Sequence, residues 1–454
     1  MERNSARRPR VGAYRLAGLL AAGIFLISSV AANAQTVERV VHISVDGLNV
    51  AMLRGLLDDS PELVPGFSRL IDEGAYTFNA RTDYNYTTTV PNHVSMITGR
   101  PVVQPEGQPD TVHHGITTNG PAQSATIHSI GNLALGYIPS VFDAVHDRGL
   151  GTAFFASKTR LAAFVERSYN AQYGAPDTLG ADDGRDKIDD YFNLDGDSDA
   201  AVTNFLAAMD AAPRTYSLVH IVDPDYAGHA SDWESDEYRD AVLATDERVM
   251  RILDYVGSDA DFAGKTAVLL TTDHGGAGEN HTDPLVGGSY TIPAFLWGPD
   301  IPAGVDFYSL LANRTDPGDA RPDYNAPQQP LRNGDTGNLA LALLGLPPVS
   351  GSSMIPVLSL SPDPIPGDID RSGSVDRLDL ALFAGHFGTT GATWETGDFD
   401  GDGNATLVDL ALLQTNLTHA AADSPQAASV PEPPALVLAT LAAVAIVAPS
   451  RWRR

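Results

Sequence analysis

Three short apolar runs, each followed by an aspartate, constrain the fold of this chain more than any other feature. They are residues 40–45 before Asp46, residues 216–222 before Asp223, and residues 266–272 before Asp273. Continuous runs of this length, rich in β-branched residues, are typical of strands buried in a parallel sheet. The stretch 235–256 has the spacing of an amphipathic helix. The sequence therefore predicts an α/β domain with a central, mostly parallel sheet flanked by helices.

The aspartates that follow these runs are candidate metal ligands. In an open α/β sheet, ligands bind beyond the carboxyl ends of the strands, and that edge would bring together Asp46, Asp225 and Asp273. An aspartate at a single strand end could equally cap a helix or a turn. Histidines at ligand-like spacing weaken this alternative. They are His229, which follows Asp225, and His274 and His281, which follow Asp273.

The number and type of these groups indicate two ions rather than one. Three carboxylates and three histidines exceed the four ligands of a closed tetrahedral zinc site, but they suit two zinc-like ions with positions open for a substrate. Two divalent cations would also relieve the repulsion among the carboxylates. The chain has no cysteine, so any metal must be held by histidines and oxygen ligands. Cysteine nucleophiles and disulfide scaffolds are excluded for the same reason.

The net charge excludes another class of protein. The chain has 57 Asp and Glu residues against 29 Lys and Arg residues, which gives a net charge of −28. A chain this acidic repels nucleic acid and anionic lipid surfaces. We therefore expect no duplex nucleic acid among its partners.

A candidate nucleophile lies at the start of a predicted helix. Thr89 stands just before Pro91, which suits the first turn of a helix, and Gly99 suits its end. The hydroxyl of Thr89 would then lie at a helix N-terminus, which is a ready site for a phosphate. A coordinating metal could lower the pKa of this hydroxyl enough for nucleophilic attack. Taken alone, Thr89 could also be an ordinary helix cap.

Six short motifs occur in the order found in a known family. They are Val45-Asp-Gly47, Thr89-Val-Pro-Asn-His93, His114-Gly-Ile116 with Asn119, Pro224-Asp-Tyr-Ala-Gly-His229, Asp273-His-Gly275, and His281. Over roughly residues 38–305 this set resembles the type I phosphodiesterase/nucleotide pyrophosphatase branch of the alkaline phosphatase superfamily. The resemblance implies an alkaline-phosphatase-like fold with two metal sites. The implied ligands are Asp225, His229 and His281 for one metal, and Asp46, Thr89, Asp273 and His274 for the other.

The resemblance also implies a reaction. Metal-activated Thr89 would attack phosphorus in a phosphate diester or pyrophosphate and form a phosphothreonine intermediate, which water then hydrolyses, while Asn92 hydrogen-bonds a phosphoryl oxygen. A phosphomonoesterase on the same core is an alternative, because a two-metal core serves monoesters and diesters alike. A sulfatase is disfavoured, because Thr89-Val-Pro-Asn-His93 lacks the Cys/Ser-x-Pro-x-Arg pattern of that family.

Other polar residues of this region receive weaker interpretations. Lys158 follows a predicted strand over 152–156 and stands where related phosphonoacetate hydrolases have a substrate-binding lysine. Phosphonoacetate hydrolysis is therefore a third alternative, although Lys158 could equally be a solvated surface residue. The remaining histidines are expected in structural roles or in shaping the pocket. The five to which such a role is assigned are His42, His93, His113, His114 and His220.

A duplicated acidic loop lies near the C-terminal end. The segment 368–379 recurs as 398–409, and each copy runs into a leucine-rich stretch that predicts a helix. Loop positions 1, 3, 5 and 12 offer oxygen ligands and position 6 is glycine, as in an EF-hand loop. The candidate calcium ligands are Asp368, Asp370, Ser372, Ser374, Asp376 and Asp379 in the first copy, and Asp398, Asp400, Asp402, Asn404, Thr406 and Asp409 in the second.

With Asp at position 12 and only a following helix, the pair resembles dockerin type I repeats. The resemblance implies a small all-α module that binds two calcium ions and a cohesin-like partner. It also supports an alternative of another class, a non-catalytic, calcium-dependent surface or assembly protein. Every position needed for two metals and a nucleophile is filled in the large domain, which favours the enzyme.

Both ends of the chain carry expected transport signals. Five arginines, the apolar run 16–30 and Ala32-Asn33-Ala34 predict a signal peptide over 1–34. Val430-Pro-Glu-Pro433, the apolar run 435–448 and three terminal arginines resemble the PEP-CTERM sorting signal, with a plain transmembrane tail as the alternative. That signal implies bacterial sorting machinery and transit across the inner membrane. We therefore expect an exported protein that is extracellular or associated with the cell surface or envelope.

The predicted segments follow from these features. They are a signal peptide 1–34, a phosphodiesterase domain 35–356, a Pro-rich linker 357–366, dockerin-like repeats 367–420, a second linker 421–429, and a sorting signal 430–454.

Overall fold

The computed structural model describes residues 37–180, 184–360, 365–369 and 375–417. The chain divides into two compact units, residues 1–360 and 361–454. The predicted signal peptide, the linker 421–429 and the sorting signal lie outside the described residues. In the described part of the chain, no helix has the length and apolar character needed to cross a bilayer.

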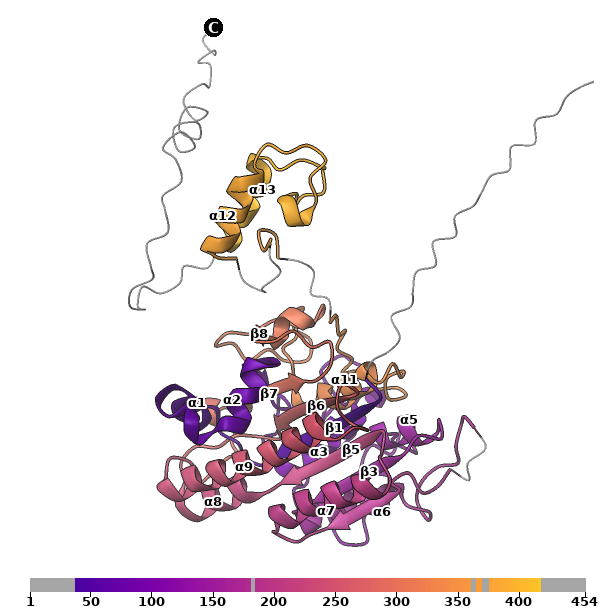
Figure 1. The fold of residues 1–454 in the computed structure, drawn as a ribbon. Helices are drawn as coiled ribbons and strands as arrows, with labels where there is room; N and C mark the ends of the chain where they lie inside the picture. Colours follow the sequence, from indigo (N-terminus) through magenta and orange to yellow (C-terminus); the bar gives the residue numbers. More distant parts are fainter. Residues whose placement is uncertain (1–36, 181–183, 361–364, 370–374, 418–454) are drawn as a thin grey trace, which may run out of the picture. The chain divides into compact units, whose positions relative to one another are not determined.

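The large unit is built on an eight-stranded mixed sheet with the order β4-β3-β5-β1-β6-β7-β2-β8 (Figure 1). The strands are β1 Arg39–Val45, β2 Ala75–Arg81, β3 Thr152–Ala156, β4 Asp190–Asn193, β5 Tyr216–Ile221, β6 Thr266–Thr272, β7 Thr291–Trp297 and β8 Val305–Asp306. The pairs from β4 to β6 are parallel, and β7 runs antiparallel to β6 and β2. The predicted strands are confirmed as β1, β3, β5 and β6, and the predicted fold class is confirmed with them.

Helices flank this sheet. The α-helices of the large unit are α1 Val50–Asp59, α2 Pro65–Asp72, α3 Thr89–Thr98, α4 Ile127–Ile130, α5 Val141–His146, α6 Thr159–Tyr169, α7 Ser198–Ala211, α8 Asp223–Ser231, α9 Asp236–Ser258, α10 Gly287–Tyr290 and α11 Thr336–Leu343. Short 3-10 helices are η1 Pro61–Leu63, η2 Asp110–Val112, η3 Phe307–Leu310 and η4 Asn333–Asp335. The predicted helix over 235–256 is α9, and the helix predicted to begin near Thr89 is α3.

Strand β1 lies in the middle of the sheet and contributes to two cores. Val41, Ile43 and Val45 belong to a core shared with α1, α2, α7 and α9. Val40 belongs to a second core shared with α3, α5, α6 and α11. Because both faces of the sheet are covered, a central strand needs apolar side chains in both directions. This accounts for the continuous apolar run in the sequence.

The register of the central strands places the candidate ligands at one edge. Val45 of β1 pairs with Ile221 of β5 on one side and with Thr272 of β6 on the other. The three strands therefore end level with one another. The residues that follow them leave the sheet together, which brings Asp46, the start of α8 and Asp273 into one site.

The C-terminal unit is small and mainly helical. Its elements are α12 Arg377–His386, η5 Trp394–Thr396 and α13 Leu407–Asn416. A compact apolar core that includes Phe383, Phe399 and Leu413 holds these elements together. The helices α12 and α13 match the two that the leucine-rich stretches predict.

Candidate active site

Three buried aspartates from different elements meet at the carboxyl edge of the sheet. Asp46 follows β1, Asp273 follows β6, and Asp225 lies in the first turn of α8; each is at most 2% exposed. The backbone N–H of Asp225 donates to the carbonyl of Asp46 over 3.1 Å. Gly47, with φ of +74°, allows this approach, because a Cβ there would lie 2.9 Å from the Cα of Asp225. The glycine after Asp46 is therefore part of how the site is built.

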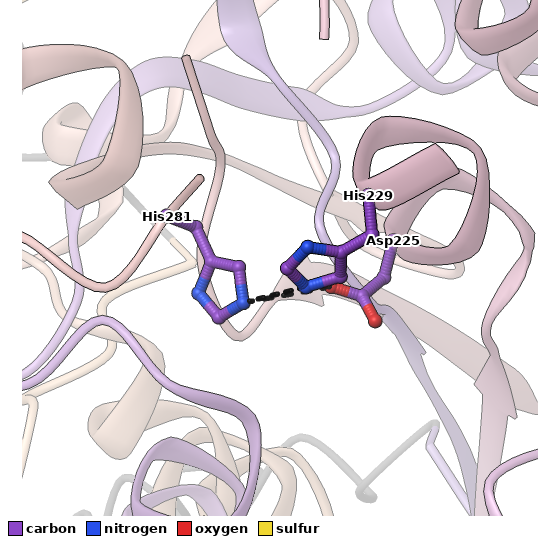
Figure 2. Close-up of side chains that lie close together, drawn as sticks. All are labelled: Asp225, His229 and His281. Atoms are coloured by element: carbon purple, nitrogen blue, oxygen red, sulfur yellow. Dashed lines mark hydrogen bonds and ion pairs between the residues drawn. The ribbon is translucent and has the colours of Figure 1, made fainter. Parts of the chain in front are cut away.

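Two histidines converge on Asp225, as Figure 2 shows. The Nε2 atoms of His229 and His281 lie 3.1 Å apart, and they lie 3.5 and 3.8 Å from Asp225 Oδ1. His281 Nδ1 donates to the Thr87 carbonyl over 2.6 Å, so its Nε2 carries the lone pair that faces the cluster. Asp225, His229 and His281 are close enough to bind one metal ion.

A second group gathers around His274. Its Nε2 lies 3.5 Å from Asp46 Oδ1, 3.9 Å from Asp225 Oδ1 and 3.3 Å from Asp273 Oδ2. The Nδ1 of His274 donates to the Gly275 carbonyl over 2.8 Å, which leaves the Nε2 lone pair for the site. Asp46, Asp225 and His274 form a second set that could hold a metal ion. Asp225 belongs to both sets, so the two candidate sites adjoin.

The donor atoms fit two divalent cations. Asp46 Oδ1, Asp225 Oδ1 and Asp273 Oδ2 are buried, and none has a hydrogen-bond partner among the described residues. A buried carboxylate oxygen without a partner is costly, and these oxygens face histidine lone pairs. Mixed imidazole and carboxylate ligands are those that zinc prefers.

The electrostatics of the site agree with this fit. Burial, together with repulsion from Asp46, raises the pKa of Asp225 and raises that of Asp273 well above its ordinary value. Burial lowers the pKa of His281 and holds that of His274 well below its usual range, so both imidazoles are neutral and able to act as ligands. Divalent cations would counter the repulsion among the carboxylates.

Lys158 lies at the centre of the site, and the interpretation as a solvated surface lysine is wrong. Its Nζ donates to Asp46 Oδ2 over 2.8 Å, to Asp225 Oδ2 over 2.9 Å and to Thr89 Oγ1 over 3.0 Å. Burial would raise the pKa of Asp46, but Lys158 and a hydrogen bond from His220 outweigh it and hold this pKa well below its usual range. Lys158 bonds to the Oδ2 atoms of Asp46 and Asp225 and leaves the Oδ1 atom of each aspartate to a metal. The lysine and the metal ions could therefore occupy the site together.

Thr89 lies between the ligand groups and Lys158. It is the first residue of α3, which Gly99 ends in the left-handed conformation at φ of 63°. Its side chain is buried, and its Oγ1 lies 3.4 Å from His274 Nε2. The carbonyl of Thr89 accepts a hydrogen bond of 2.8 Å from His93 Nδ1. These contacts fix the hydroxyl against the second group of candidate ligands.

The amide of Asn92 does not fit its predicted role. Its Nδ2 donates to the carbonyls of Tyr86 and Thr88, and its Oδ1 accepts from Asp83 N and Asn333 Nδ2. Both amide hydrogens are therefore used inside the protein, and Asn92 holds the loop before α3. The predicted contact with a phosphoryl oxygen is not supported at this residue.

Asn119 is better placed for that contact. Its Oδ1 accepts a hydrogen bond of 2.8 Å from the backbone N–H of Val90, and its exposed side chain lines the same cavity as Thr89. Because the Oδ1 is anchored, the Nδ2 is free to face a bound group. The sequence signal was available, since Asn119 closes the His114-Gly-Ile116 motif.

Two histidines assigned to structural roles support the candidate ligands. His220 Nε2 donates to Asp46 Oδ2 over 3.2 Å, and His93 Nδ1 lies 3.6 Å from Asp273 Oδ2. His93 Nε2 is hydrogen-bonded to the Ser44 hydroxyl over 2.8 Å. The hydrogen bond from His220 is of the kind that orients a metal ligand, and His93 holds Thr89 through the hydrogen bond from its Nδ1 to the Thr89 carbonyl. Their positions inside strands and helices gave no sequence signal of this role.

The second calcium loop brings three of its predicted ligands together. Asp398, Asp400 and Asp409 offer oxygens close enough for one ion. The Gly at position 6, Gly403, has φ of +81°, the left-handed conformation that the sharp turn requires. Asn404 and Thr406 make local hydrogen bonds, and Thr406 caps α13.

The first loop is only partly described. Asp370, Ser372 and Ser374 lie outside the described residues. Asp379 accepts from the backbone N–H groups of Ile369 and Asp376, in the same way that Asp409 accepts from Phe399 and Thr406. The aspartate at position 12 of each loop, at the start of the following helix, therefore accepts the same two backbone hydrogen bonds from its loop.

The fold and these side chains together define a metal-dependent hydrolase. Comparison with family models matches residues 40–288 to "Type I phosphodiesterase / nucleotide pyrophosphatase" and residues 366–418 to "Dockerin type I domain". The chain belongs to the type I phosphodiesterase/nucleotide pyrophosphatase family and carries a C-terminal dockerin domain.

A comparison with curated proteins finds none that matches. Among solved structures, murine ectonucleotide pyrophosphatase/phosphodiesterase 5 is 13% identical, covering 68% of this chain and 95% of that one, with a TM-score of 0.46. The human counterpart is 12% identical, covering 68% and 96%, with a TM-score of 0.46. A protein in the alkaline phosphatase superfamily from Vibrio parahaemolyticus is 16% identical, covering 70% and 68%, with a TM-score of 0.40.

Proposed function

We propose that this protein is an exported two-metal hydrolase that cleaves phosphate diesters or pyrophosphates, with Thr89 as the nucleophile. One observation carries the proposal. The Thr89 hydroxyl lies 3.4 Å from His274 Nε2 and 3.0 Å from Lys158 Nζ, beside two ligand sets that share Asp225. The buried, unpartnered oxygens of Asp46, Asp225 and Asp273 support a metal role for this cluster.

The proposed ligands are Asp225, His229 and His281 for one ion, and Asp46, Thr89, Asp273 and His274 for the other. Zinc is the proposed metal, because its preferred ligands are those present. Bound here, two such ions would lower the pKa of the Thr89 hydroxyl and neutralise the phosphoryl oxygens.

The protein groups then have separate tasks. Thr89 Oγ forms the bond to phosphorus as one ester or anhydride oxygen leaves, and the phosphothreonine intermediate keeps the other substituent of the phosphorus. Water later displaces Thr89 and releases that group as a phosphate monoester. Lys158 holds the Thr89 oxygen through its hydrogen bond of 3.0 Å and offers positive charge to the phosphoryl group. The Nδ2 of Asn119, rather than that of Asn92, donates to a phosphoryl oxygen.

The other segments of the chain would determine where the enzyme is located. We infer that residues 35–356 form the catalytic domain and that residues 367–420 bind two calcium ions and a cohesin-like partner. The signal peptide 1–34 and the sorting signal 430–454 would direct export and attachment at the envelope. Dockerin domains and this enzyme family are typical of extracellular and cell-surface proteins, which supports that location.

The experiment compares two substrates on the zinc-loaded chain from residue 35. Hydrolysis of bis-p-nitrophenyl phosphate and of p-nitrophenyl phosphate is measured for the wild type and for Thr89→Ala. A preference for the diester that is lost in Thr89→Ala supports the proposal. A preference for the monoester would instead make the enzyme a phosphomonoesterase with the same nucleophile.

A matched control lies one residue away. The Thr88 hydroxyl is buried but has no hydrogen-bond partner among the described residues. Thr88→Ala should therefore keep full activity. If Thr88→Ala and Thr89→Ala lost activity equally, the loss would reflect damage to α3, and the assignment of Thr89 would fail.

A further inference from the structure

The cavity that opens onto Thr89 has a cation with no partner. The cavity has a volume of about 760 Å³, and its lining includes Thr89, Asn119, Lys158, Arg160 and Tyr226. Lys158 is already bonded to Asp46 and Asp225. Arg160, by contrast, makes no ion pair or hydrogen bond with any residue in the described part of the chain.

Arg160 is exposed and lies between two segments that form the cavity wall. Arg160 is the second residue of α6, directly after the segment that carries Lys158. A Cβ built on Gly120 would lie 3.2 Å from a guanidinium nitrogen of Arg160, so the guanidinium lies against the bare backbone beside Asn119. The cation is thus on the cavity wall, next to the amide proposed to contact the phosphoryl group.

The carboxylate in the lining does not neutralise Arg160. Asp195 also lines the cavity, but its Oδ1 accepts a hydrogen bond of 2.7 Å from the Thr159 hydroxyl, and no ion pair joins it to Arg160. A guanidinium presents a planar set of donors that matches carboxylate and phosphoryl oxygens. In a chain of net charge −28, an unpaired arginine in the substrate cavity is well suited to a specific anion.

We propose that Arg160 binds a second anionic group of the substrate, a phosphoryl or a carboxylate group that lies beyond the scissile phosphorus. This inference rests on the proposed function and deepens it. Substrates with such a group are favoured over diesters whose other substituents are neutral. Arg160 is thus a specificity-determining residue, whereas Lys158 serves the transferred phosphoryl group itself.

The test compares substrates with and without a second anion on the zinc-loaded enzyme. The kcat/KM values for bis-p-nitrophenyl phosphate, ATP and phosphonoacetate are measured for wild type, Arg160→Ala and Arg160→Lys. In Arg160→Ala, kcat/KM should fall about 10- to 100-fold for a substrate whose second anion Arg160 binds, which is the factor of one charge-assisted hydrogen bond. For bis-p-nitrophenyl phosphate, whose substituents are neutral, kcat/KM should fall less than about 2-fold. Arg160→Lys should recover part of the loss. An effect on ATP assigns a phosphoryl group, and an effect on phosphonoacetate assigns a carboxylate.

Two controls keep the proposal falsifiable. Arg239→Ala removes a cation from α9, which does not line the cavity, and should change none of the three activities. An equal loss on all three substrates in Arg160→Ala, or no loss on any of them, would overturn the proposal.

A binding measurement, which needs no hydrolysis, tests the Arg160 subsite separately from the proposed function. If the wild type cleaves none of the three substrates, the proposed function fails, and calorimetry with inorganic pyrophosphate still tests the subsite. Affinity that falls at least about 10-fold in Arg160→Ala but not in Arg239→Ala supports the subsite. Equal affinity in wild type and Arg160→Ala overturns it.

Discussion

The two candidate ion-binding regions of this protein are built in opposite ways. The candidate ligands of the large unit lie between Asp46 and His281 and are brought together by three strand ends and a helix. The candidate ligands of the second acidic loop lie within Asp398–Asp409 and are arranged by hydrogen bonds among close neighbours. The candidate ligands of the first region are buried except for His229, which is exposed, whereas much of the second region is exposed.

This difference has a consequence for how each region responds to its ion. The sheet fixes the carboxylates of the large unit, so the fold should persist without metal while the reaction stops. The calcium loop has only a small apolar core behind it, so its stability should depend on the ion. Substitutions should therefore separate activity from stability in the two regions.

The largest effect is expected at Asp225, which belongs to both metal sets. Asp225→Asn should lower kcat for diester hydrolysis by at least about 10³-fold, because one substitution removes charge from both proposed sites. Folding should be retained, as measured by circular dichroism and thermal unfolding. Asp223→Asn, in the same helix turn but paired with Arg248 over 3.5 Å, is the matched control and should keep its activity. Equal loss in both variants would contradict the assignment.

Asn119→Ala should give the next largest effect. Removing one donor to a developing oxyanion costs about 10²- to 10³-fold in kcat. Steady-state kinetics of diester hydrolysis by the zinc-loaded enzyme measure this loss of kcat. Asn92→Ala should instead lower thermal stability, because its four hydrogen bonds hold the loop before α3. If Asn92→Ala lost kcat at unchanged stability while Asn119→Ala did not, the two roles would have to be exchanged.

His220→Gln should weaken metal binding by about 10- to 100-fold, because its hydrogen bond orients Asp46. Zinc affinity measured by competition with a chelator tests this expectation. Saturating zinc should restore most of the activity, which distinguishes a positioning residue from one that contacts the substrate. His42→Gln is the control. His42 is equally buried, but it bonds to Tyr216 and does not touch the site. Identical zinc affinities in the two variants would argue against the role of His220.

The smallest effect on activity is expected in the C-terminal unit. Asp409→Ala removes hydrogen bonds to Phe399, Asp400 and Thr406. It should destabilise this unit by about 2–4 kcal/mol at unchanged kcat. A calcium chelator should have the same effect, seen as rapid proteolysis of residues 365–417 with the large unit intact. A parallel loss of diester hydrolysis would show that the two regions are not independent.

The sequence predicted the parts of the site that depend on strand ends. Apolar runs ending in Asp46 and Asp273 located the carboxyl edge of the sheet, because a continuous apolar strand must be central and its end must face the ligand side. A different local signal, Pro91 near the start of a helix and Gly99 at its end, located Thr89 at the start of α3. These predictions needed only local pattern and one rule of topology.

The sequence could not predict the contacts made across the fold. Asn92 and Asn119 both lie in motifs, and only their hydrogen bonds decide which amide is free. Lys158 could have been a surface residue, because nothing near it in the sequence indicates that its side chain reaches Asp46 and Asp225. His220 looks like a core residue until β5 is placed beside β1.

The most direct test of the central claim is to trap the covalent intermediate. Zinc-loaded enzyme is mixed with bis-p-nitrophenyl phosphate, quenched in acid within one turnover and digested, and the peptide that contains Thr89 is examined by mass spectrometry. The account predicts a p-nitrophenyl phosphoryl adduct on Thr89, formed with release of one p-nitrophenol, that is present in the wild type and in Thr88→Ala and absent in Thr89→Ala. Turnover by Thr89→Ala at the wild-type rate, or an adduct on another residue, would contradict it.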